Sequence, residues 1–148
     1  MLTVKSILVP TDFSEHSDKA LKQALDIAKL SKAKLYLLHV VHEAVHQCAA
    51  DYCLSDEMMR QMESGMTSAA QQSLKAQLAK FPEAKEADVV TEVRRGFPSD
   101  EILKEQQEKK IDLIVIGPLG RTGIARFLVG SVTKNVVKEA KCPVLVAK

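Results

Sequence analysis

The chain has 148 residues, of which 46% are hydrophobic and 27% are charged, so it fits a single globular domain with an ordinary core. The formal net charge of +2 is too small to indicate a nucleic-acid-binding protein, and no apolar run is long enough to span a membrane. Three irregularly placed cysteines fit a reducing compartment, and the first residues lack a signal-peptide pattern. We therefore expect one domain over residues 1–148 and a cytoplasmic location.

The first half of the chain alternates short apolar runs with helical periodicity. Residues 5–10 and 34–41 are apolar on both faces, which is typical of strands inside a parallel sheet. Between them, apolar residues recur at helical spacing over residues 17–30. Residues 42–54 show no period and are predicted to form a loop, and a long helix follows over residues 55–81.

The long helix contains a methionine stripe. Met58, Met62 and Met66 recur at the spacing of one helical face, and Ala70 and Leu74 continue the same pattern. A cofactor pocket or a pliable binding groove would also use such a stripe, but core packing is the more common role of methionine. We therefore predict that these side chains are buried.

The second half continues the alternation. Residues 88–95 alternate and end in two arginines, as expected of an edge strand whose charges discourage association. Residues 96–101 supply a turn and the acidic first turn of a helix. A buried strand is predicted at 111–116, a helix at 130–140 and a last apolar strand at 143–147.

This order of elements predicts an α/β fold: a doubly wound, five-stranded parallel sheet of order 3-2-1-4-5 with helices on both faces. In such sheets, ligands bind past the carboxyl ends of the strands where the winding reverses, here between the first and fourth strands. Those ends are followed by Pro10, Thr11 and Asp12 in one loop and by residues 117–120 in the other. The two loops are therefore predicted to meet at one cleft.

The second of these loops has an unusual glycine spacing, Gly117-x2-Gly120-x9-Gly130-Ser131, directly after a buried strand. Its length favours a functional loop over a plain connection, although glycines there are also ordinary turn residues. Gly130 and Ser131 open the next helix, where free amides and the hydroxyls of Ser131 and Thr133 predict a phosphate cradle; capping of that helix is the alternative role of the hydroxyls. Neither the P-loop pattern nor the G-x-G-x-x-G dinucleotide pattern is present.

Other reactive side chains support weaker hypotheses. Asp12 has a structural alternative as a helix cap, and Cys142 reads as a small buried hydrophobic residue. Potential metal ligands fall close together in the sequence at His39, His42, His46, Cys48, Asp51 and Cys53. Their spacing matches no known zinc finger, so we predict ordinary loop residues and no metal site. No set of residues in the glycine loop fits phosphoryl transfer, so no catalytic residue is predicted.

Over essentially its full length, the chain resembles the universal stress protein family in its single-domain, ATP-binding form. The matching pieces are ILVPTDFS, LLHVV, DLIVIG, the glycine spacing and KCPVLVAK. The resemblance implies an adenine-nucleotide alpha-hydrolase-like fold and bound ATP, with ADP or AMP as alternatives and Mg²⁺ or Mn²⁺ as the cation. Together with the loop patterns, it predicts a binding set of Pro10, Thr11, Asp12, Val40, Ile116, Gly117, Gly120, Arg121, Gly130, Ser131, Val132 and Thr133.

The chain departs from the family pattern between its first two glycines, where Pro118 and Leu119 replace a small polar residue and a histidine. Proline lacks an amide donor and leucine lacks a polar group, so weaker or altered phosphate binding is expected. Arg121 offsets part of this loss if it pairs with a phosphate.

These inferences predict a cytoplasmic, homodimeric, ATP-binding regulatory protein that acts through nucleotide-dependent shape or contacts with an unknown protein partner. The dimer is expected to form through residues 143–147, because that strand is apolar and lacks protective charges at a sheet margin. The alternatives are an enzyme that hydrolyses or transfers nucleotides in the same cleft and a nucleotide-free dimer that acts by protein contacts. Neither nucleic acid nor a membrane is expected as a partner.

Overall fold

The structure is a computed structural model that describes residues 3–42, 54–120 and 129–148. Its elements are, in chain order, β1 (Ser6–Pro10), α1 (Glu15–Ser31), β2 (Lys34–His42), α3 (Asp56–Ala79), the 3₁₀ turn η1 (Pro82–Glu86), β3 (Val89–Gly96), α4 (Pro98–Glu108), β4 (Leu113–Ile116), α5 (Ser131–Glu139) and β5 (Val144–Val146). None of the helices in these ranges is long and apolar enough to cross a membrane.

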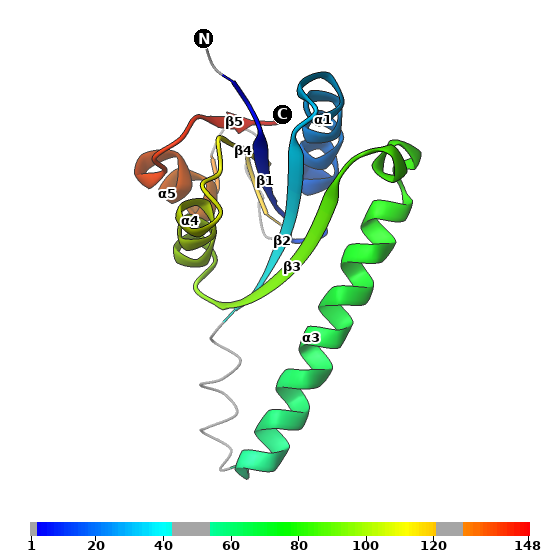
Figure 1. The fold of residues 1–148 in the computed structure, drawn as a ribbon. Helices are drawn as coiled ribbons and strands as arrows, with labels where there is room; N and C mark the ends of the chain where they lie inside the picture. The colour runs from blue at the N-terminus through cyan, green and yellow to red at the C-terminus, as the bar shows by residue number, and fades with distance from the viewer. Residues whose placement is uncertain (1–2, 43–53, 121–128) are drawn as a thin grey trace.

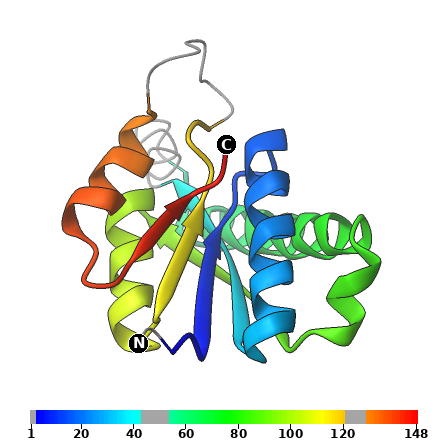
Figure 2. The ribbon, with the colours of Figure 1, turned by 90° about the horizontal axis from the view of Figure 1, so that it is seen from above.

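The five strands form one parallel sheet of order β3-β2-β1-β4-β5. Helices α1 and α3 cover one face, and α4 and α5 cover the other (Figures 1 and 2). The predicted fold class and strand order are confirmed. β1 pairs with β2 on one side and with β4 on the other. The winding of the chain therefore reverses between β1 and β4.

The central strands are apolar on both faces because each face of the sheet packs against its own pair of helices. In β1, Ile7 and Val9 join the core cluster beneath α1 and α3, whereas Leu8 joins the cluster beneath α4 and α5. All three side chains are fully buried. This two-sided burial fixes the strand register, since a slip by one residue would exchange the two faces.

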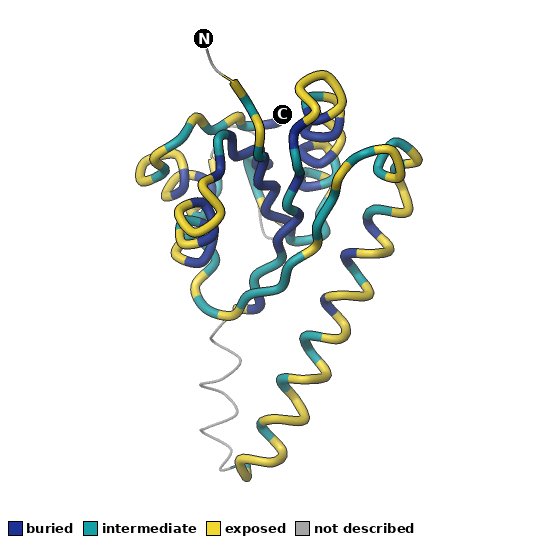
Figure 3. The backbone as a smooth tube through the Cα atoms, viewed as in Figure 1, coloured by how far each residue is buried: buried dark blue, intermediate teal, exposed yellow. Residues whose placement is uncertain are grey.

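The predicted burial of the methionine stripe is wrong for its first half. Met58 is 51% exposed and Met62 is 43% exposed, while Ala70, Leu74 and Gln77 are the buried residues of α3. The reason is the position of the helix: its first half extends beyond the end of the sheet, so it has no strand to pack against (Figures 1 and 3).

The two edge strands of the sheet, β3 and β5, differ in charge. β3 forms one edge, as predicted, but its terminal arginines do more than discourage association. Arg94 pairs with three glutamates of α4, and Arg95 pairs with Glu63 of α3 at 2.7 Å. β5 forms the opposite edge, where Leu145 is 36% exposed. The charges of β3 therefore dock two helices onto the sheet.

Candidate functional site

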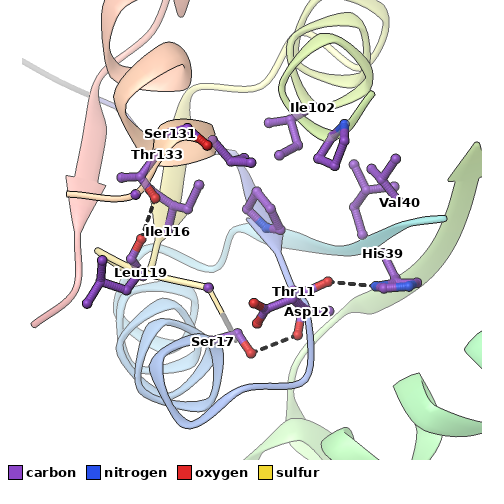
Figure 4. A pocket seen from close by; sticks show the side chains of 17 residues that line it. Thr11, Asp12, Ser17, His39, Val40, Ile102, Ile116, Leu119, Ser131 and Thr133 are labelled. Carbon is purple, nitrogen blue, oxygen red and sulfur yellow. Dashed lines mark hydrogen bonds between the residues drawn. The ribbon is translucent and has the colours of Figure 1, made fainter. Parts of the chain in front are cut away.

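A cavity of about 340 Å³ opens where β1, β2 and β4 end (Figure 4). Its walls come from the turn after β1, the end of β2, the first turn of α4, the glycine segment after β4 and the first turn of α5. The lining residues are Pro10, Thr11, Asp12, Ser17, Leu38, His39, Val40, Pro98, Ile102, Ile116, Gly117, Leu119, Gly120, Gly130, Ser131, Val132 and Thr133.

Every predicted binding residue except Arg121 lines this cavity, and Arg121 lies outside the described residues. The cavity also includes residues outside the predicted binding set, among them Ser17, Ile102 and His39, which the sequence suggested only as a possible metal ligand. Ile102 belongs to α4, a helix that the sequence predicted but did not assign to the site. Leu119 and Val40 lie on opposite sides of the cavity in Figure 4.

The two loops predicted to meet do so. A Cβ added to Gly120 would lie 2.8 Å from Oδ2 of Asp12, so the glycine segment runs directly against the turn after β1. The amide of Gly130, the N-cap of α5, donates to the carbonyl of Pro118 at 2.7 Å. This contact places the start of α5 beside the end of β4 and closes one side of the cavity.

Gly117, a member of the predicted binding set that lines the cavity, also packs closely against α1. A Cβ at this position would lie 2.9 Å from Cβ of His16 and 3.0 Å from its carbonyl carbon. Real Cβ atoms essentially never lie within 3.0 Å of such atoms, and a helix backbone cannot shift cheaply. Glycine is therefore required at this position by the packing of β4 against the first turn of α1.

The first turn of α5 presents backbone amides to the cavity. Its N-cap is Gly130, which has no side chain, and the first helical bond runs from the amide of Lys134 to the carbonyl of Gly130. The proposed capping role of the hydroxyls is wrong for Thr133, because its buried Oγ1 donates to the carbonyl of Gly117 at 2.7 Å. The amides of the first turn have no partner within the helix, which makes this end attractive to an anion.

Asp12 is a member of the turn rather than the cap of α1. The N-cap is Ser14, whose Oγ accepts from the amide of Ser17 at 3.3 Å. Asp12 Oδ1 accepts from the amide of Ser14 at 3.0 Å, and its Oδ2 faces Gly120. The capping alternative is thus wrong, and the carboxylate lies at the cavity wall.

His39 fixes the shape of this turn. Its Nδ1 lies 2.8 Å from the carbonyl oxygen of Thr11, and because a carbonyl only accepts, Nδ1 carries the proton. The imidazole also packs against the ring of Phe13, with the centroids 4.5 Å apart. Phe13 has a φ of 64°, a left-handed conformation that is costly for a bulky side chain. The contacts with His39 help to hold this strained turn.

The possible metal ligands do not form a site within the described residues. His46, Cys48, Asp51 and Cys53 lie outside them. His39 contacts Thr11, and in the described ranges no group of three or more metal-ligating side chains is found. Cys142 is only partly buried against the core beneath α4 and α5, and this burial raises the pKa of its thiol.

The sequence model of the universal stress protein family matches residues 3–148. The chain belongs to the universal stress protein family. Among curated relatives, the universal stress protein MJ0531 of Methanocaldococcus jannaschii is 38% identical over 147 residues, which cover 97% of this chain and 82% of the relative.

Solved structures of universal stress proteins share the fold. The structure of MJ0577 from the same organism has a TM-score of 0.84 and 31% identity, covering 99% of this chain and 96% of its own. A universal stress protein in complex with cAMP has a TM-score of 0.69 and 26% identity, covering 97% of this chain and 96% of its own. In this universal stress protein, Leu119 lies in the cavity wall, between the glycines Gly117 and Gly120 that also line it.

Proposed function

We propose that this universal stress protein binds an adenine nucleotide, with ATP as the leading ligand and ADP or AMP as alternatives, and that occupancy regulates its contacts with a protein partner. One observation supports the proposal. The backbone amides at the start of α5 and the carboxylate-bearing turn at Asp12 line the same cavity. The cavity of about 340 Å³ is within the usual range of ligand pockets, ~300–1,000 Å³.

The chemistry of the cavity suggests an orientation for the nucleotide. Val40 and Ile102 provide apolar surface away from the glycine segment, which suits a flat purine base (Figure 4). The amide end of α5, beside Ser131, suits the phosphates. Asp12 lies on the wall between these regions in our proposal, within reach of the ribose or base. The solved relative that contains cAMP supports this class of ligand.

Mg²⁺ or Mn²⁺ fits the proposal as a companion of the phosphates. Such ions in nucleotide sites are held mainly by phosphate oxygens and water, with one or two carboxylates. Asp12 is the carboxylate among the described lining residues. The ion would neutralise phosphate charge, and this need is increased by Leu119, which offers no polar side chain to the phosphates.

Ser131 allows a test that separates phosphate binding from folding. It is exposed at the first position of α5, so Ser131→Glu places a carboxylate where the helix dipole favours negative charge by ~0.3–1 kcal/mol. The same carboxylate would repel phosphate by ~1–3 kcal/mol at about 5 Å, depending on the local dielectric. We expect ATP to bind at least about fivefold more weakly, while the melting temperature stays the same or rises.

The matched control is Ser131→Gln, which has the same size and no charge. Isothermal titration measures the affinity for Mg·ATP and for adenosine, which lacks phosphates. The affinity for ATP should fall in Ser131→Glu alone, and the affinity for adenosine should be the same in both variants. Equal ATP affinities in the two variants would contradict phosphate binding at α5. Mass spectrometry of nucleotide retained by the gently purified wild type identifies ATP, ADP or AMP, and ATP turnover in the same samples tests the enzyme alternative.

A further inference from the structure

We propose that Gln77 of α3 is a positioning residue for the nucleotide site, which it shapes through Thr11, and that it couples nucleotide binding to the last turns of α3. The inference rests on the proposed function, because it concerns the same cavity. Gln77 is itself outside the cavity lining and 2% exposed. A buried amide inside the predominantly apolar face of a helix requires polar partners, and these partners lead to the site.

The partners form a continuous relay from α3 to the turn after β1. Gln77 Oε1 lies 2.8 Å from Oγ1 of Thr11, and Gln77 Nε2 lies 2.8 Å from Oδ1 of Asp18 and 3.3 Å from Oγ of Ser17. Lys80, just after α3, donates to Oδ2 of Asp18 at 2.9 Å. The relay joins residues that are 66 positions apart in the chain.

The chemistry of the relay fixes the direction of each hydrogen bond. The Asp18 carboxylate, paired with Lys80, only accepts, so the amide nitrogen of Gln77 must face it and the amide oxygen must face Thr11. Thr11 therefore donates its hydroxyl proton to Gln77. Its oxygen remains available as an acceptor, and the amide of Phe13 donates to it at 3.0 Å.

This arrangement makes Gln77 a support for the site. Thr11 lines the cavity, and the bond from Phe13 to Thr11 closes the turn around Asp12. Phe13 holds a strained left-handed conformation, which persists only where its surroundings impose it. His39 braces the turn through the carbonyl of Thr11, and Gln77 braces it through the hydroxyl. Removal of Gln77 leaves the buried hydroxyl of Thr11 with a poorer hydrogen-bond acceptor and so loosens the turn.

The same bonds also bear on α3. The buried side chains of this helix are Ala70, Leu74 and Gln77, all in its second half, and Arg95 supplies a separate polar anchor nearer the middle. A ligand that orders the turn after β1 lowers the entropic cost of holding Gln77, so it should stabilise the last turns of α3. By linkage, a well-held Gln77 should raise the affinity for the ligand by the same factor.

The first measurement compares the affinities of variants for Mg·ATP by isothermal titration. Gln77→Leu keeps the approximate volume and removes both bonding groups, and we expect about tenfold weaker binding. Gln77→Glu should be at least as weak, because its carboxylate faces that of Asp18. The double variant Asp18→Asn/Gln77→Glu reverses donor and acceptor across the relay and should recover part of the affinity lost in Gln77→Glu. A purely structural role for Gln77 predicts no such rescue.

The second measurement is amide hydrogen exchange with and without saturating Mg·ATP. In the wild type we expect ATP to slow exchange about threefold or more in residues 74–80 as well as in the turn after β1. In Gln77→Leu, at ATP concentrations that restore saturation, the turn should be protected but α3 should not. The control is Arg95→Ala, which breaks the bonds to Glu63 and Thr67 but leaves the relay intact. It should keep the wild-type affinity and the wild-type response of residues 74–80.

The outcomes separate the two proposals. If the wild type fails to bind ATP, ADP or AMP at millimolar concentration, the proposed function fails and this inference fails with it. If the wild type binds ATP but residues 74–80 do not respond, or respond equally in Gln77→Leu, the inference is overturned and the proposed function stands. If Gln77→Leu does not fold, the exchange of the wild type and the affinity of the Asp18→Asn/Gln77→Glu pair decide the question.

Discussion

Glu105 of α4 predicts an unusual dependence of stability on pH. Its side chain is 1% exposed, its Oε2 accepts from Arg94 at 2.6 Å, and its buried Oε1 has no hydrogen-bond partner among the described residues. Arg94 is shared with Glu101 and Glu108, so it compensates the charge of Glu105 only in part. Burial, and then the nearby carboxylate of Glu92, raise the pKa of Glu105 to about 7.

The sign of the effect follows from this direction. Because the pKa is raised from 4.5 in the unfolded chain to about 7 in the folded protein, the folded state binds the proton more tightly. The resulting stabilisation is fully present below about pH 4.5 and is lost as the pH rises through 7. A shift of this size corresponds to about 3 kcal/mol as an upper value. The wild type should therefore lose stability between pH 5 and 8, on the order of 2–3 kcal/mol from this group.

Glu105→Gln should remove this dependence. The new amide oxygen accepts from Arg94 and the new amide nitrogen donates to Glu92, so both atoms are satisfied at every pH. Urea denaturation followed by circular dichroism at pH 5, 6, 7 and 8 measures the difference in unfolding free energy. We expect the unfolding free energy of the variant to increase relative to that of the wild type as the pH rises. The variant should be the more stable protein at pH 8.

A neighbour on the same helix provides the control. The pKa of Glu108 is lowered by its hydrogen bond to Arg94, and its side chain is 59% exposed. Glu108→Gln should therefore have a small destabilising effect that is constant from pH 5 to 8 and disappears only as the pH falls below about 4.5, outside the tested window. A free-energy difference between Glu105→Gln and the wild type that is constant from pH 5 to 8, or a variant less stable at pH 8, would refute the reasoning.

Three further predictions concern the glycine segment and the last strand. Gly117→Ala should lower the unfolding free energy by ~1–3 kcal/mol in urea denaturation, because its Cβ meets the backbone of α1. Gly120→Ala should fold with little loss, because its Cβ meets only the mobile end of the Asp12 carboxylate at 2.8 Å, but it should weaken ATP binding in isothermal titration by displacing that carboxylate. We also propose a homodimer through β5, where Leu145 is 36% exposed at the sheet edge. Leu145→Glu should shift the mass measured by light scattering from that of a dimer to that of a monomer. A wild type that is already monomeric would contradict the proposal.

The fold was accessible from the sequence because its strongest signals are local. Apolar runs such as residues 7–9 have no polar residue on either face, which only a strand covered on both sides requires. Glycines and prolines then marked most of the boundaries between elements. The methionine stripe shows the limit of this reasoning. Periodicity reveals which face of a helix is apolar, but Met58 and Met62 are exposed because the helix runs past the sheet, and no local pattern records that length mismatch.

The residues that line the cavity were largely predictable from the sequence, but the residues that hold those lining residues in place were not. Two loops singled out by separate patterns meet at the winding reversal, as the topology requires. Gln77, by contrast, reads in the sequence as one more polar residue of a surface helix. Its burial depends on a partner 66 positions away, and Arg94 likewise binds glutamates of the following helix rather than solvent. Contacts of this kind depend on tertiary placement, which a single sequence does not encode in any short window.

The three glycines of the segment respond to different constraints, and this affects what the spacing means. Gly117 is required by the helix backbone at His16, so it would be needed even without a ligand, whereas a Cβ on Gly120 would meet only the end of the Asp12 carboxylate. A Cβ on Gly130 would meet only ordinary contacts, the nearest at 3.5 Å. Packing therefore explains Gly117, whereas Gly130 leaves the amide end of α5 open for a reason that packing does not supply. Binding experiments on α5 consequently test nucleotide recognition more directly than substitutions at the end of β4.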